Sequence, residues 1–217
     1  MTLRLLLIGL TSTVASSASA APLVADNGDD VTTLAAFCKQ LDPPRETCSI
    51  ADADKILDLA KPVAPYLAAR LFWAGDSITT PNNDCYIGLQ TKQGFTVASL
   101  GTDCWGKGKY SRRFVVRELA VRAPTLLWLR YAIDSSDPDW SGTTTNEFLV
   151  ICGMAQDRPR CTSPIELGLA TDGKPIWRVK VTLTKTGSLT LALDKGKRAA
   201  LPAETAALLG KTTLAFE

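Results

Sequence analysis

Residues 176–194, IWRVKVTLTKTGSLTLALD, alternate apolar and polar side chains on both sides of a short turn. Alternation with a period of two is typical of a β-strand that buries one face. The turn residues Lys185, Thr186 and Gly187 predict a three-residue hairpin loop in which the glycine adopts a left-handed conformation. This stretch therefore predicts an antiparallel hairpin and points to a mainly β protein.

The loop length also predicts the register of this hairpin. It sets Thr184 opposite Ser188, and the apolar residues of both strands then share one face. The expected apolar pairs are Leu183 with Leu189, Val181 with Leu191, and Val179 with Leu193. On the opposite face, Arg178 is expected to meet Asp194 and form a cross-strand ion pair.

A second hairpin is predicted at residues 85–101, CYIGLQTKQGFTVASLG, where the turn again reads Thr, Lys, any residue, Gly. A three-residue loop would set Leu89 opposite Val97 and Ile87 opposite Ser99. It would also set Cys85 opposite Gly101.

Three further strands are predicted between the hairpins, at residues 114–122, 125–134 and 146–154. In the middle one, both faces are apolar. One face carries Leu127, Leu129, Tyr131 and Ile133, and the other carries Leu126, Trp128 and Ala132. A strand that is apolar on both faces is covered on both sides, so we expect it to be central in its sheet.

The first part of the chain predicts helices instead. Residues 29–41 place Leu34, Phe37 and Leu41 on one helical face before a Pro-Pro pair ends the run. Ser49 can cap a second helix over residues 51–61, and residues 65–75, PYLAARLFWAG, are interpreted as a third.

These elements predict an α+β fold in one compact domain. A short helical segment over residues 31–75 is expected to pack on a mainly antiparallel β-sheet or β-sandwich formed by residues 76–217. The alternative is a closed β-barrel with N-terminal helices.

The first twenty residues read as a secretory signal peptide. Arg4 precedes a short apolar run, and small residues end the segment at Ala20. Residues 21–30 are expected to form a flexible lead-in. The run is too short for a membrane span, so we expect a soluble exported protein, either periplasmic or extracellular.

The charge of the chain is nearly balanced. The 217 residues include 24 Lys and Arg against 22 Asp and Glu. This balance argues against nucleic acid as a partner.

The six cysteines form an even set in a chain that we expect to be exported, which predicts three disulfides. Six thiols allow fifteen pairings. Proximity in the chain favours Cys38 with Cys48, Cys85 with Cys104, and Cys152 with Cys161.

The chain contains no histidine, which removes Ser-His and Cys-His catalysis and the common zinc sites. We therefore expect a protein that is not an enzyme and that has no cofactor and no metal. Carboxylates could still form an acid/base pair, from the set Glu118, Asp134, Asp137, Asp139 and Glu147. Calcium binding by Asp26, Asp29 and Asp30, or by the acids at 134–139, lacks a recognised ligand spacing.

One stretch combines aromatic and basic side chains, DCWGKGKYSRR at residues 103–113. Aromatic faces beside cations suit an anionic glycan or the acidic rim of a protein partner. A surface connection with a structural role is the simpler alternative. The candidate binding residues are Trp105, Lys107, Lys109, Tyr110, Arg112 and Arg113.

Two classes of function follow from these observations. The first is an exported, disulfide-stabilised binding or inhibitor-like protein without catalytic activity. The second is a carboxylate-dependent hydrolase of cell-envelope or extracellular polysaccharide. A structural role in an envelope assembly is a third possibility.

Overall fold

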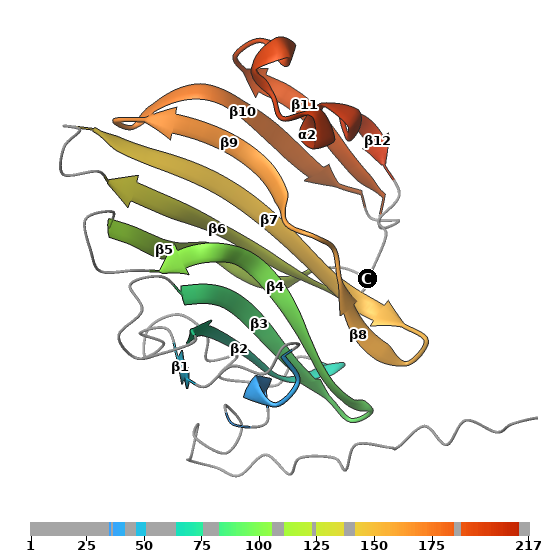
Figure 1. Ribbon diagram of the computed structural model, residues 1–217. Coiled ribbons are helices and arrows are strands. Elements are labelled where there is room, and N and C mark those ends of the chain that lie inside the picture. Colours follow the sequence, from blue (N-terminus) through green and yellow to red (C-terminus); the bar gives the residue numbers. More distant parts are fainter. Residues whose placement is uncertain are drawn as a thin grey trace, which may run out of the picture.

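The computed structural model describes residues 35, 37–41, 47–50, 64–75, 83–105, 111–122, 125–136, 142–184 and 188–212. Most of these residues lie in antiparallel strands that form two sheets (Figure 1). The expected signal peptide and lead-in, residues 1–30, lie outside the described part of the chain. No helix within the described ranges is long and apolar enough to cross a membrane.

The N-terminal sheet has four strands in the order β1-β2-β3-β4. Their bounds are Thr47–Ile50 (β1), Tyr66–Gly75 (β2), Asn83–Thr91 (β3) and Gly94–Trp105 (β4).

The C-terminal sheet has eight strands in the order β12-β11-β10-β9-β7-β6-β5, with β8 paired to β7. Its first strands are Ser111–Arg122 (β5), Leu126–Ser136 (β6), Thr143–Ala155 (β7) and Arg158–Cys161 (β8). The remaining strands are Ile165–Thr171 (β9), Lys174–Leu183 (β10), Leu189–Lys195 (β11) and Gly210–Thr212 (β12).

The β10–β11 hairpin has the predicted register. Leu183 pairs with Leu189, Val181 with Leu191, and Val179 with Leu193. The Thr184 N–H donates to the Ser188 carbonyl, as the expected loop requires, although residues 185–187 themselves lie outside the described residues. A bulge beside Arg178 sets it opposite Lys195 in the ladder, yet the predicted ion pair with Asp194 forms.

The β3–β4 hairpin differs from its predicted register by one residue over most of its length. The turn closes around Lys92 and Gln93, with Thr91 opposite Gly94, so the loop has two residues instead of three. Ile87 therefore faces Ala98, and Leu89 faces Thr96. A bulge next to Cys85 then restores the expected pairing of Cys85 with Gly101.

The prediction of a helix over residues 65–75 is wrong, because Tyr66–Gly75 form strand β2. This strand is apolar on both faces. Ala69 and Leu71 join the core between the sheets, while Phe72 and Ala74 pack on the other side. Two apolar faces conceal the period of two from a reading of the sequence.

The described chain is mainly antiparallel β with little helix, which confirms the antiparallel sheets of the predicted α+β fold but not its N-terminal helical segment. Of the helix predicted at 29–41, only residue 35 and residues 37–41 are described, and the helix predicted at 51–61 lies outside the described residues. Phe37 packs on the N-terminal sheet, with its ring centroid 5.8 Å from that of Phe72. Within the described residues the strands form two open sheets and no closed barrel, which argues against the barrel alternative.

The main core lies between the two sheets. From β6 it contains Leu127, Leu129 and Tyr131, all fully buried, and from β7 it contains Val150 and Cys152. The other face of β6 contributes Trp128 to a second core cluster. As predicted, β6 is an internal strand covered on both faces.

The second core cluster lies on the other side of the C-terminal sheet. Apolar residues of β9, β10 and β11 meet there with Leu201, next to the short helix α2 (Ala203–Ala207). The Thr205 hydroxyl donates to the Glu166 carbonyl and ties α2 to β9. Burial raises the pKa of the Glu166 carboxyl, and the nearby carboxylate of Glu204 raises it further.

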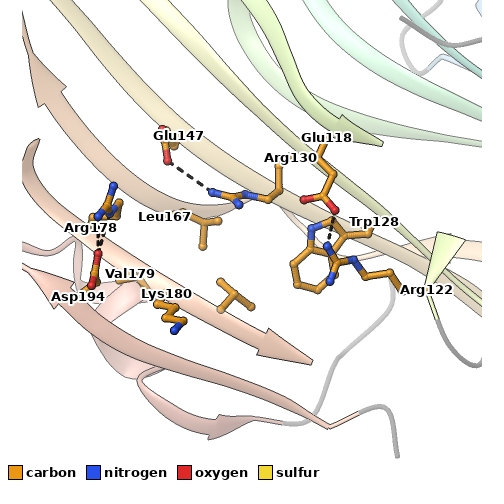
Figure 2. Close-up of a pocket in the computed structure, with 11 residues that line it drawn as sticks. Glu118, Arg122, Trp128, Arg130, Glu147, Leu167, Arg178, Val179, Lys180 and Asp194 are labelled. Carbon is orange, nitrogen blue, oxygen red and sulfur yellow. Dashed lines mark hydrogen bonds and ion pairs between the residues drawn. The ribbon is translucent and has the colours of Figure 1, made fainter. Parts of the chain in front are cut away.

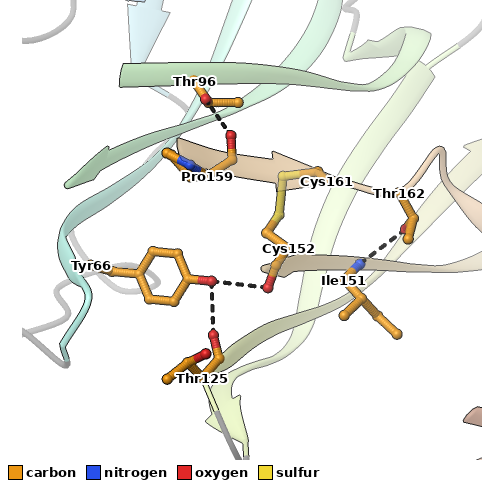
Figure 3. Close-up of a disulfide and its surroundings, with 8 residues drawn as sticks. All are labelled: Tyr66, Thr96, Thr125, Ile151, Cys152, Pro159, Cys161 and Thr162. Carbon is orange, nitrogen blue, oxygen red and sulfur yellow. Dashed lines mark hydrogen bonds between the residues drawn. A yellow bond between two sulfur atoms is a disulfide. The ribbon is translucent and has the colours of Figure 1, made fainter. Parts of the chain in front are cut away.

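Two of the three predicted disulfides join described residues, Cys38 with Cys48 and Cys152 with Cys161. The second links directly opposed residues of β7 and β8 (Figure 3). Cys85 is also disulfide-bonded, but the side chain of its expected partner, Cys104, lies outside the described residues.

A buried tyrosine connects the two sheets beside this disulfide. The Tyr66 hydroxyl lies 3.0 Å from the carbonyl oxygens of both Thr125 and Cys152 and donates to them (Figure 3). Burial raises the pKa of Tyr66 to about 12. Burial also raises the pKa of Tyr131, whose hydroxyl donates to the Leu100 carbonyl.

Candidate functional site

The predicted aromatic-basic loop is described only at its ends. Lys107, Lys109 and Tyr110 lie outside the described residues, as does the side chain of Trp105. Arg112 and Arg113 are neighbours on β5, with Arg112 half-buried and Arg113 exposed. Side chains of adjacent strand residues point to opposite faces, so these two arginines do not act on one ligand together.

The structure instead forms a groove on the C-terminal sheet, with a volume of about 410 Å³ (Figure 2). Residues from six strands line it, which are β5, β6, β7, β9, β10 and β11. The charged lining residues are Glu118, Arg122, Arg130, Glu147, Arg178, Lys180 and Asp194.

Three ion pairs surround the groove. They are Glu118 with Arg122, Glu147 with Arg130, and Asp194 with Arg178. The Arg178 pair is close, with Nη2 2.6 Å and Nε 2.8 Å from Asp194 Oδ2. The Arg130 pair is loose, because Nη2 lies 3.8 Å from Glu147 Oε2, beyond hydrogen-bond distance.

Two cations at the groove have hydrogen-bonding capacity to spare. The Arg130 guanidinium makes no hydrogen bond with the described residues, although its side chain is 40% exposed. The Lys180 ammonium has neither a hydrogen bond nor an ion pair within the same ranges, but Lys180 alternates with the buried Val179 and therefore points away from the face that carries Trp128. Since the lining contains four cations and three carboxylates, the groove has a net charge of +1.

Trp128 supplies a third free donor. The residue is only 3% exposed, and its indole Nε1 is buried without a hydrogen-bond partner among the residues that the structure describes. A buried donor without a partner costs about 1–3 kcal/mol. An acceptor atom of a ligand that reached Nε1 would recover part of this cost.

The Glu118–Arg122 pair covers this tryptophan. Arg122 Cζ lies 4.7 Å from the centroid of the Trp128 ring, a cation–π contact. Figure 2 shows Glu118 and Arg122 beside the indole. Exposed ion pairs contribute only about 0–1 kcal/mol and exposed cation–π contacts about 0.5–1 kcal/mol, so moving this cover costs about as much as the unpaired donor does.

The space between Glu147 and Arg178 depends on a glycine. Gly168 of β9 pairs with Glu147 on one side and with Arg178 on the other. A Cβ added at Gly168 would lie 3.7 Å from Glu147 Oε2 and 3.7 Å from Arg178 Cγ. The missing side chain therefore keeps the two charged residues accessible from the groove.

The five carboxylates considered for catalysis are separated by the fold. Glu118 and Glu147 line the groove, and each is paired with an arginine. Asp134 lies outside the groove lining and accepts a hydrogen bond from the Thr145 hydroxyl, at 2.7 Å. Asp137 and Asp139 lie outside the described residues, as do Asp26, Asp29 and Asp30.

Arg112 lines a second, smaller hollow of about 300 Å³ together with Ser135, Asn146 and Phe148. Asn146 Oδ1 is buried there and has no hydrogen-bond partner in the described part of the chain. The Asn146 residue as a whole is only partly buried, so this hollow is a weaker candidate than the groove.

The groove was not predicted from the sequence. Glu118, Glu147 and the Arg178–Asp194 pair were predicted separately, and Trp128 was predicted to lie on the second face of a central strand. Their position on one surface was not predicted. Contacts between charged residues on the same face of neighbouring strands can be predicted only when the strand order and register are known. Comparison of the chain with protein-family models, curated proteins and solved structures gives no match.

Proposed function

We propose that this chain is an exported, disulfide-braced binding protein without catalytic activity, and that the groove on its C-terminal sheet binds a ligand with an acidic group. The indole N–H of Trp128, which has no partner among the described residues, and the loosely paired Arg130 two residues further on β6 carry this proposal. Both groups donate hydrogen bonds and neither accepts one, so the complementary group is an anionic acceptor.

Two further observations support a binding role. Two carboxylates of the groove, Glu118 and Asp194, are closely ion-paired with arginines, which occupy oxygens that a general acid or base would need. Export is supported by the N-terminal sequence and by disulfides among the described residues, since disulfides persist in oxidising compartments.

The experiment is an NMR titration of the indole N–H signals with galacturonate and with inorganic sulfate, and with neutral galactose as the control ligand. The signal of Trp128 is assigned with Trp128→Phe. We expect both anions, but not galactose, to shift this signal. Arg130→Gln should weaken binding about ten-fold or more, because hydrogen bonds to charged groups contribute about 1.5–3 kcal/mol.

Matched variants separate the groove from general surface charge. Lys174→Met, which changes an exposed lysine of β10 outside the groove, should leave anion binding unchanged. Glu118→Gln should strengthen binding, because it removes the ion pair that holds Arg122 over the Trp128 ring. Equal binding by wild type and Arg130→Gln would overturn the proposal.

A carboxylate-dependent hydrolase is the second candidate, because Glu118 and Glu147 line the same groove. Two carboxyl groups on either side of a sugar are the arrangement that glycoside hydrolysis uses. This candidate predicts new reducing ends when oligosaccharides are incubated with the protein, and loss of that activity in Glu147→Gln. Recovery of intact oligosaccharide from a binding-competent sample would contradict it.

A further inference from the structure

We infer that the ligand of the groove is an acidic oligosaccharide that lies across the strands, with one acid group held by Arg130 and the Trp128 N–H. This inference rests on the proposed function and narrows it to one class of ligand. Three observations support it, which are the shape of the groove, the polarity of its lining and the contact of Arg122 with the Trp128 ring.

The shape of the groove favours an elongated ligand. The charged lining residues extend from Glu118 on β5 to Asp194 on β11. This span covers six neighbouring strands, including β5 and β11 themselves. Neighbouring strands lie about 4.8 Å apart, so five intervals span roughly 24 Å along the curved sheet. Several linked sugar rings fit this span, whereas a single small anion would contact only one part of it.

The polarity of the groove favours a ligand that both donates and accepts hydrogen bonds. Glu147 and Asp194 are acceptors, and Arg130 and the Trp128 indole are donors, within one lining. Hydroxyl groups can do both, so a sugar chain can bond to carboxylates and cations in turn. A ligand that carried carboxylates alone could not donate hydrogen bonds to the three carboxylates of the groove, and its negative charges would be repelled by them.

The covered tryptophan decides how such a sugar would be held. Sugar-binding aromatic residues usually present an open ring face, but the ring face of Trp128 is occupied by Arg122. The inferred contact is therefore through the indole edge, where N–H donates to a carboxylate or sulfate oxygen. Glu118 and Arg122 must move aside for this contact, and both are partly exposed on β5.

Binding of this kind depends on charge as well as on length. The groove has an excess of one positive charge, and its free donors are those of Arg130 and the Trp128 indole. Neutral sugars of equal length should therefore bind far more weakly than acidic ones. Because the charged groups are partly exposed, salt should weaken the acidic ligand more than the neutral one.

The test is calorimetric titration of the full mature chain with α-1,4-linked trigalacturonate, with monomeric galacturonate, with neutral maltotriose and with a hexaglutamate peptide. We expect trigalacturonate to bind at least ten-fold more tightly than galacturonate, and maltotriose not to bind. Asp194→Asn should change the affinity for trigalacturonate more than the affinity for monomeric galacturonate, because Asp194 lies at the far end of the groove.

The possible results distinguish this inference from the proposed function. If galacturonate binds and trigalacturonate brings no gain, the oligosaccharide inference fails and the acid-binding groove stands. If hexaglutamate binds more tightly than trigalacturonate, the ligand is an acidic peptide and the inference also fails. If none of the four probes binds, while circular dichroism shows a folded protein, both are wrong.

Discussion

The two faces of strand β6 differ in burial and polarity. On one face, Leu127, Leu129 and Tyr131 are fully buried between the two sheets. On the other face, Trp128 is buried at the edge of a groove, and Arg130, two residues further, is 40% exposed. A single strand thus alternates between a closed apolar core and an open polar site.

The difference shows how this fold separates stability from binding. The closed face is completed by a tyrosine that connects the sheets and by a disulfide between β7 and β8. The open face contains free donors and partly exposed ion pairs, whose removal should cost little stability. Substitutions on the closed face should therefore change unfolding, and substitutions on the open face should change ligand affinity.

The largest effect is expected for Leu129→Ala on the closed face. Leu129 is fully buried, and truncation of a buried leucine costs about 2–5 kcal/mol through lost burial and a remaining cavity. Urea unfolding measures this change. Ile176→Ala is the control, because Ile176 is 48% exposed and should change the free energy of unfolding by less than about 0.5 kcal/mol. Similar costs for the two variants would contradict the division.

The second effect concerns the disulfide that closes the same region. Replacing both Cys152 and Cys161 with alanine removes a cross-link between residues nine positions apart. Loop-entropy reasoning gives a loss of roughly 2–3 kcal/mol in the free energy of unfolding. Thermal and urea unfolding of the oxidised double variant and the wild type would measure it, and the affinity for galacturonate should not change.

A smaller effect is expected for Tyr66→Phe, which removes the hydroxyl that donates to Thr125 and Cys152. The loss of this hydrogen bonding should lower the free energy of unfolding by about 1 kcal/mol near neutral pH.

This tyrosine also predicts a dependence on pH. Its pKa is raised to about 12 in the folded chain, against about 10 when unfolded. The protonated phenol is therefore favoured by folding, so its contribution is complete below about pH 10 and is lost as the pH rises toward 12. Wild type should lose more stability than Tyr66→Phe over this range. Parallel pH curves for the two proteins would exclude this role.

The smallest effect is expected for the Arg178–Asp194 pair at the groove. A double-mutant cycle with Arg178→Gln and Asp194→Asn should give a coupling energy of about 0.2–1 kcal/mol, as is usual for exposed pairs. The coupling should fall in 1 M salt, where the Debye length is about 3 Å. A coupling of several kcal/mol that resists salt would mean that this part of the open face is structural after all.

The two hairpins show how far the sequence predicts the fold. Both turns read Thr, Lys, any residue, Gly, and the same loop was predicted for both. In β10–β11, strict alternation of apolar and polar residues leaves one possible register, and the structure has it. In β3–β4, the apolar pattern is weaker, and the shorter loop with a compensating bulge is equally compatible with it.

Burial on two sides explains the main error in the fold. Strand β2 is apolar on both faces, since Leu71 and Phe72 contribute to different core clusters. An apolar run of this kind does not distinguish a buried strand from a buried helix. The aromatic residues Phe72 and Trp73 were the available signal for a strand.

The groove could not be predicted because its residues belong to strands far apart in the chain. Glu118 and Asp194 come from opposite ends of the lining, and only the strand order places them on one surface. The local ion pair between Arg178 and Asp194 was predicted because one hairpin contains both residues. Contacts within a hairpin follow from sequence spacing, whereas contacts across a sheet require its topology.

Gly168 gives this surface an adjustable depth. An added Cβ would meet the Trp177 carbonyl oxygen at 3.4 Å and the flanking charged side chains at 3.7 Å, which are ordinary contacts. Alanine is therefore tolerated there, while the larger side chains of valine and leucine would fill more of the space between Glu147 and Arg178 without altering any charge. Chains that differ at this one position could select ligands by width, and the same position offers protein engineers a size filter that leaves the framework intact.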